Sequence, residues 1–155
     1  MTGYVKLDHL QVAAFTFTRR EKDYGGIWLG VGHGSCRILR ALLEELRQQP
    51  PGHSRSVPLC AVPPQLPEAI RPGGRRIHRP LTALRIGAAA DGKTRFSVTG
   101  DSGWIALSPA ALIELGHQLD ELERGVGDLG MGGDSGEWGD RLRIWPLGSG
   151  RGLAG

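Results

Sequence analysis

The sequence predicts an α+β protein in which antiparallel sheet is covered on one face by helices. Apolar residues alternate with a period of two in several short segments, which is typical of strands, and recur with helical spacing in two longer segments. Prolines and glycines separate these segments. Hydrophobic residues make up 39% and charged residues 23% of the 155 residues. A chain of this length and composition can bury a core, and we expect one compact domain.

The most strongly marked element is a helix over 109–124. Ser108 is a favourable N-cap, and Pro109 suits the first helical position, where its missing N–H is not needed. Gly125 can end the helix. One face carries a leucine stripe, made by Leu112, Leu115, Leu119 and Leu122.

The first half of the chain predicts a similar order of elements. It has a strand at 7–18, a turn at 22–26, a strand at 27–31 and a helix at 36–48. Pro50 and the proline after it end this helix. Its apolar stripe consists of Leu39, Leu42, Leu43 and Leu46.

In the second half, strands are expected at 82–89, 93–99 and 104–107. A three-residue turn at 90–92, with Gly92 in the left-handed conformation, would join the first two strands as a hairpin. The apolar residues then match across the hairpin, with Ile86 opposite Phe96. We therefore expect the three segments to form a contiguous antiparallel sheet under the 109–124 helix.

The chain divides into two similar units around a linker. Eight of the ten prolines fall between Pro50 and Pro80, and the segment 125–140 holds seven glycines. The expected division is a first β-α unit at 1–48, a Pro/Gly-rich linker at 49–80, a second unit at 81–147 with a glycine-rich loop at 125–140 and a final strand at 141–147, and a flexible tail at 148–155.

Charge is distributed unevenly. Residues 71–95 hold seven basic residues against one acid, and residues 96–140 hold nine acids against one base. Sixteen of the nineteen basic residues are arginine. Arginine suits phosphate recognition and stacking on bases, but it is also common in proteins from GC-rich genomes.

Three of the four tryptophans fall out of phase with the aliphatic residues of their strands. Trp28, Trp104 and Trp145 each lie on the face opposite the aliphatic one. Arg85, Arg95, Arg141 and Arg143 occupy the same kind of position. Either these strands are buried on both faces, and the tryptophans are core, or an open face of arginine and tryptophan binds a single-stranded nucleic acid.

The segment 95–123 (RFSVTGDSGWIALSPAALIELGHQLDELE) and the doubled strand–strand–strand–helix order resemble the single-strand-binding folds of the Whirly and PUR-repeat type. The resemblance covers about forty residues well and the first half poorly, because the turn and third strand between Val31 and Cys36 are nearly absent. It implies binding of single-stranded DNA or RNA on the sheet, often as a dimer.

Catalytic and metal chemistry have few candidates. His33 and Cys36, with His53 and Cys60 downstream, could bind zinc, but a second closely spaced pair is missing. The glycines at 30, 32 and 34 precede a helix and could hold an anion, although the Gly-Lys-Ser/Thr ending of a Walker loop is absent. Ser35 or Cys36 as a nucleophile would need an orienting acid that nothing indicates. We expect no enzyme, no cofactor and no metal.

The sequence thus favours a non-enzymatic protein that binds single-stranded DNA or RNA. The predicted nucleic-acid-binding residues are Arg85, Arg95, Trp104, Arg141, Arg143, Trp145, Trp28, Arg75 and Arg76. The alternative is a protein–protein adaptor or inhibitor of the kind that phages and mobile elements encode, with the tryptophans and the acidic 96–140 segment as its interface. An uncharacterised enzyme is the third hypothesis. No apolar run approaches the roughly 20 residues of a membrane helix, and two cysteines form no disulfide framework, so we expect a cytoplasmic protein without a membrane partner.

Overall fold

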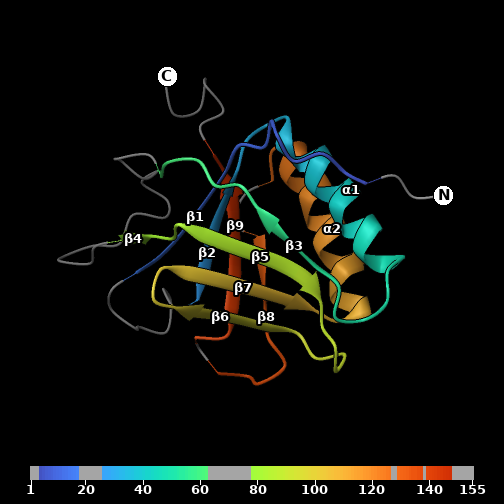
Figure 1. Ribbon diagram of the computed structural model, residues 1–155. Helices are drawn as coiled ribbons and strands as arrows, with labels where there is room; N and C mark the ends of the chain where they lie inside the picture. Colours follow the sequence, from blue (N-terminus) through green and yellow to red (C-terminus); the bar gives the residue numbers. More distant parts are fainter. Residues whose placement is uncertain (1–3, 18–25, 63–77, 127–128, 138, 148–155) are drawn as a thin grey trace.

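The part of the chain that the structure describes forms two sheets and two helices around one main core (Figure 1). The computed structural model describes residues 4–17, 26–62, 78–126, 129–137 and 139–147. The helices are α1 (Ser35–Arg47) and α2 (Pro109–Glu123). The strands are β1 (Val12–Phe17), β2 (Ile27–Val31), β3 (Ser54–Val57), β4 (His78–Pro80), β5 (Ala83–Ala88), β6 (Arg95–Thr99), β7 (Ser102–Leu107), β8 (Leu129–Gly132) and β9 (Arg141–Pro146).

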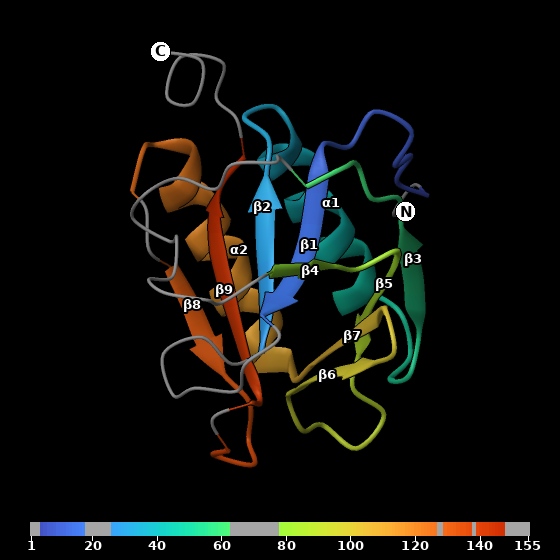
Figure 2. The ribbon, with the colours of Figure 1, turned by 90° about the vertical axis from the view of Figure 1, so that its left-hand side faces the viewer.

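The strands form two separate sheets. Sheet A has five strands in the order β4-β1-β2-β9-β8, and sheet B has four in the order β3-β5-β7-β6. Most neighbours are antiparallel, but β2 pairs with β9 and β5 pairs with β7 in parallel. Both helices lie on the same side of sheet A and pack against each other (Figure 2). The α+β class expected from the sequence is therefore observed.

The helices were correctly expected, and their boundaries follow from local chemistry. The Ser108 side chain accepts a hydrogen bond from the Ala111 amide at 3.1 Å, as an N-cap does. Gly125 ends α2 with a φ of 96°, a left-handed conformation that suits glycine. The leucine stripes of both helices are buried in the main core, and Leu119 is only 1% exposed.

The pairing of the second-half strands differs from the prediction. The three segments are contiguous, but β7 lies between β5 and β6, and β5 and β7 are parallel. The predicted hairpin between β5 and β6, with Ile86 opposite Phe96, is therefore wrong. Both residues instead flank Ile105 of β7, so their apolar phase is kept while their order in the sheet changes. Gly92 does adopt a positive φ of 74° in the connection.

Three further segments differ from the sequence-based boundaries. The first strand begins at Val12 rather than at residue 7. The glycine-rich segment 125–140, expected as a loop, contains β8, which pairs with β9. The described parts of the proline-rich segment, 49–62 and 78–80, hold no helix but do hold β3 and β4. The predicted tail at 148–155 lies outside the described residues.

The topology repeats one unit of five elements. The order β-β-α-β-β occurs as β1-β2-α1-β3-β5 and again as β6-β7-α2-β8-β9, with β4 inserted between β3 and β5. The first two strands of each unit lie in one sheet, and its last two strands lie in the other. Sheet A thus joins β1-β2 to β9-β8, and sheet B joins β6-β7 to β5-β3. Each sheet therefore contains strands of both units.

Within the described ranges, neither helix combines the length and the apolar character needed to cross a membrane.

Candidate functional site: the open face and free edge of sheet B

The outer face of sheet B, which points away from the core, is open to solvent. Its central row runs across the sheet as Ser56, Arg85, Trp104 and Ser97. Arg85 and Ser97 are exposed, and Trp104 is half-buried. Arg95 and Thr99 of β6 are exposed on the same face. The face thus carries mainly polar side chains, with Trp104 in its central row.

The outer face of sheet A is covered. Trp28 and Trp145 are 5% and 3% exposed, and both contact the ring of Phe15, with centroid distances of 6.0 and 5.9 Å. Gly30 makes room for Trp145, because a Cβ there would lie 2.8 Å from the indole ring. The guanidinium of Arg143 lies 5.2 Å from the centre of the Trp28 ring. These rings form a second small core.

The predicted nucleic-acid-binding residues therefore fall on two different surfaces. Arg85, Arg95 and Trp104 share the open face of sheet B. On sheet A, Trp28 and Trp145 are buried, and Arg141 and Arg143 are half-buried. Residues 75 and 76, both arginine, lie outside the described residues. The structure brings three of the nine predicted residues together on one accessible face.

Because the topology repeats, the two outer faces can be compared at equivalent positions. Trp28 is paired across β2–β9 with Arg143, and Trp104 is paired across β7–β5 with Arg85, at equivalent positions of the two sheets. The neighbours differ. Sheet A has Phe15 opposite its tryptophan, where sheet B has Ser97. Likewise, sheet A has Trp145 where sheet B has a glycine at residue 87. Sheet B thus lacks the large rings that close the equivalent face of sheet A.

The edges of the sheets also differ in what occupies them. An unpaired strand edge presents rows of backbone donors and acceptors, and proteins commonly cover it. Along β6, the Phe96 amide donates to Asp140 at 2.6 Å and the Thr94 amide donates to Asp134 at 2.6 Å. Along β8, the Gly130 carbonyl accepts from the Gln118 side chain at 2.9 Å. Each of these edges is therefore held at least at one backbone group by a side chain.

Strand β3 has no such side-chain contact at its outward-facing backbone groups within the described part of the chain. The Ala88 amide donates to the His53 carbonyl at 3.0 Å, so His53 faces β5. In an antiparallel ladder successive residues alternate between the partner and the opposite side. Ser54 and Ser56 therefore turn their backbone N–H and C=O groups to the free edge. No hydrogen bond from another described segment reaches those groups.

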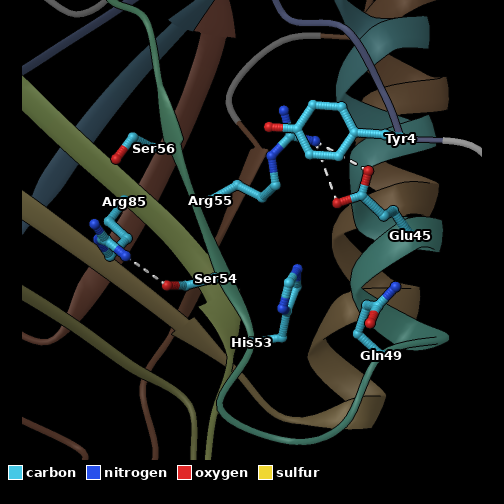
Figure 3. Close-up of a pocket in the computed structure, with 8 residues that line it drawn as sticks. All are labelled: Tyr4, Glu45, Gln49, His53, Ser54, Arg55, Ser56 and Arg85. Atoms are coloured by element: carbon cyan, nitrogen blue, oxygen red, sulfur yellow. Dashed lines mark hydrogen bonds and ion pairs between the residues drawn. The ribbon is translucent and has the colours of Figure 1, made fainter.

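A groove of about 530 Å³ follows this free edge (Figure 3). It lies between β3 and the second half of α1, and the side chains that line it are almost all polar. They are Tyr4, Glu45, Gln49, His53, Ser54, Arg55, Ser56 and Arg85.

A buried ion pair anchors β3 beside α1. Arg55 donates to both carboxylate oxygens of Glu45, at 3.0 and 3.2 Å, and the two side chains are 9% and 4% exposed. The Glu45 carboxylate also accepts from the Val5 amide at 2.8 Å. The ring of Tyr4 stacks over the Arg55 guanidinium at 3.8 Å, a cation–π contact. The N-terminal segment, α1 and β3 therefore meet at one wall of the groove.

Sequence reasoning missed this cluster and the free edge. The signal was the segment Ser54–Val57, a short alternating stretch between Gly52 and Pro58. It is too polar and too short to stand out as a strand by hydrophobic alternation. The partner of Arg55 could not be read from the sequence, because Glu45 looks like an ordinary helix-surface acid next to Glu44.

The candidate metal and nucleophile residues do not assemble into a site. No group of three potential metal ligands occurs within the described residues. Cys36 is buried, and its pKa is raised mainly by the loss of solvation, with a further contribution from the charge of Glu123. A thiol with a raised pKa is a poor nucleophile. Ser35 is buried, and its hydroxyl accepts from the Gln11 amide at 2.7 Å.

Comparison with known proteins identifies no matching family, no similar curated protein and no similar solved structure. The resemblance to Whirly and PUR-repeat folds thus stays a prediction.

Proposed function

We propose that this chain is a protein-binding module that engages its partner through sheet B, at the open outer face and the free edge of β3. The observation that carries the proposal is the contrast between edges. The β6 and β8 edges each bind at least one side chain, whereas the outward-facing backbone groups of Ser54 and Ser56 in β3 have no partner among the described residues and lie beside a groove. An exposed strand edge is a common recognition surface for proteins.

The distribution of charge supports protein over nucleic acid as the partner. The predicted arginines are divided between two sheets, and Arg95 is paired with Asp91 at 2.9 Å. The adaptor hypothesis used the acidic segment 96–140 as an interface, but three acids of this segment are engaged within the chain. Asp134 and Asp140 accept hydrogen bonds from the amides of Thr94 and Phe96, and Asp120 pairs with Arg40 between the helices.

Selection of random dodecapeptides displayed on phage against the immobilised full chain tests the proposal. We expect the selected peptides, added to the ¹⁵N-labelled protein, to shift the NMR signals of β3 amides and of the Trp104 indole. Scrambled versions of the same peptides are the control. Peptides that instead shift only signals of sheet A or of the outward faces of the helices would contradict the proposal, as would the recovery of no binder.

A second candidate function, single-strand binding, is favoured by the adjacency of Trp104 and Arg85 on the open face. Affinity for fluorescein-labelled oligo(dT) and oligo(U) is measured over a salt series. Each phosphate contact contributes about 0.7 to the log–log salt slope on a single strand, so replacing both Arg85 and Arg95 by alanine is expected to flatten the slope by about 1.4. Trp104→Ala is expected to weaken binding by about 1–3 kcal/mol and leave the slope unchanged.

Arg37→Ala is the matched control, because Arg37 is an exposed arginine on α1. An equal effect of Arg37→Ala would show that the attraction is not localised on sheet B. A wild-type protein with no salt-dependent affinity for either oligonucleotide would remove this function.

A further inference from the structure

We infer that the groove beside β3 receives an extended, acidic segment of the partner protein, which pairs with β3 and becomes a fifth strand of sheet B. This inference rests on the proposed protein-binding function and specifies the form and charge of the partner segment.

The backbone of β3 provides the first requirement for strand addition. Ser54 and Ser56 lie two residues apart and direct their N–H and C=O groups to the same side. They supply two donors and two acceptors at the spacing that an incoming strand needs. The groove along this edge is the space that the incoming strand would occupy (Figure 3).

The side chains above β3 provide the charge preference. Arg85 is exposed, and its guanidinium donates to the Ser54 hydroxyl at 2.9 Å, so it reaches from β5 across the outer face of β3. No carboxylate of the described residues lies in ion-pair range of it. A glutamate or aspartate opposite Ser54 or Ser56 on this face would lie next to that guanidinium. Opposite charges at neighbouring cross-strand positions stabilise the pairing.

On the inner wall of the groove, the positive charge of Arg55 is already compensated, so Arg85 is the arginine available to a partner. Arg55 is neutralised by Glu45, and the cation–π contact with Tyr4 fixes its position. Self-pairing of β3 with a second copy would bring two Arg85 side chains, neither with a counter-ion among the described residues, onto one face. Like charges at these positions are unfavourable. The charges therefore favour an acidic segment of a different protein.

The test uses two defined peptides, fluorescein-labelled acetyl-(Glu-Val)₄-amide and acetyl-(Lys-Val)₄-amide, with the full chain. We expect the glutamate peptide to bind at least tenfold more tightly. Ser56→Pro removes one edge N–H that is not used inside the sheet, a position where a strand tolerates proline. It is expected to weaken binding at least tenfold, while the matched variant Ser56→Ala changes it less than twofold. Arg85→Ala is expected to remove most of the preference for glutamate.

Thermal melting of each variant separates lost binding from lost folding. If Ser56→Pro melts at a lower temperature than Ser56→Ala, strand addition is tested instead by amide hydrogen exchange in the wild-type protein. The glutamate peptide should then slow exchange of the Ser54 and Ser56 amides. Unchanged exchange, or equal binding by Ser56→Pro and Ser56→Ala, would overturn strand addition. Equal affinity for both peptides would overturn the acidic preference.

Two results have distinct meanings for the proposed function. Phage-selected peptides that map to sheet B but bind Ser56→Pro normally would leave protein binding in place and overturn strand addition alone. A concentration-dependent doubling of the protein's mass that Ser56→Pro abolishes would overturn the inference in favour of a second copy of this chain.

Discussion

Cutting the chain between Asp91 and Gly92 should yield two fragments that are unfolded alone and fold when they are mixed. The cut separates the two β-β-α-β-β units in the connection between β5 and β6. Each unit keeps strands for two different sheets, and the strands that complete those sheets belong to the other unit. Fragment 1–91 keeps only β4-β1-β2 and β3-β5, and the second fragment keeps only β6-β7 and β8-β9. Two-stranded pairs are marginally stable at best in water, and the three-residue β4 adds little to β1-β2. We therefore expect each fragment alone to have no stable folded state.

Circular dichroism of each fragment and of the equimolar mixture measures this effect. The control is the uncut chain with the protease site inserted in the same connection, which should melt as the wild type does. A fragment 1–91 that melts cooperatively by itself would contradict the exchange of strands between the units.

Replacing Glu45 by alanine should destabilise the protein by about 3–5 kcal/mol, because it leaves the Arg55 guanidinium buried without its counter-ion. Glu45 and Arg55 are both almost fully buried, and Glu45 also binds the Val5 amide. Urea unfolding monitored by tryptophan fluorescence gives the free energy of unfolding. Glu45→Gln, which keeps the shape and one acceptor, should cost less.

Glu44→Ala is the matched control, one position earlier on the same helix. Glu44 forms an exposed pair with Arg47 at 2.7 Å, and solvent screens pairs of this kind so strongly that they contribute little to stability. Equal losses for Glu44→Ala and Glu45→Ala would show that the Arg55 pair does not anchor β3.

The elements themselves were largely predictable, because their signals are local. Ser108, Pro109 and the leucine stripe define α2 within a single stretch of sequence. Alternation correctly assigned the apolar faces of β5, β6 and β7. It could not give their order, because Ile86, Ile105 and Phe96 occupy one row of the sheet and their faces match whichever strand is central. A short hairpin connection favoured the wrong neighbour.

The candidate site was less predictable, because exposure depends on what covers a face. Trp28 and Trp104 both lie on the face opposite the aliphatic residues of their strands. Each is also paired with an arginine on the neighbouring strand. Phe15 from the neighbouring strand β1 and Trp145 from the distant strand β9 cover Trp28, whereas Trp104 has no such rings beside it and stays half-buried. Whether an edge strand such as β3 stays free depends likewise on which other segments of the folded chain reach it.

The exchange of strands between the two units has a consequence for the order of folding during synthesis. All four strands of sheet B lie between Ser54 and Leu107, so this sheet can assemble while the rest of the chain is still being made. In sheet A, β2 can pair with β9 only after the chain has been synthesised beyond Leu142, the partner of Ile27. Contacts between residues so distant in sequence close late and slow the folding of a domain. Until β9 is made, β2 leaves the ribosome with one edge unpaired, and this early hydrophobic strand is the part of the nascent chain most exposed to aggregation.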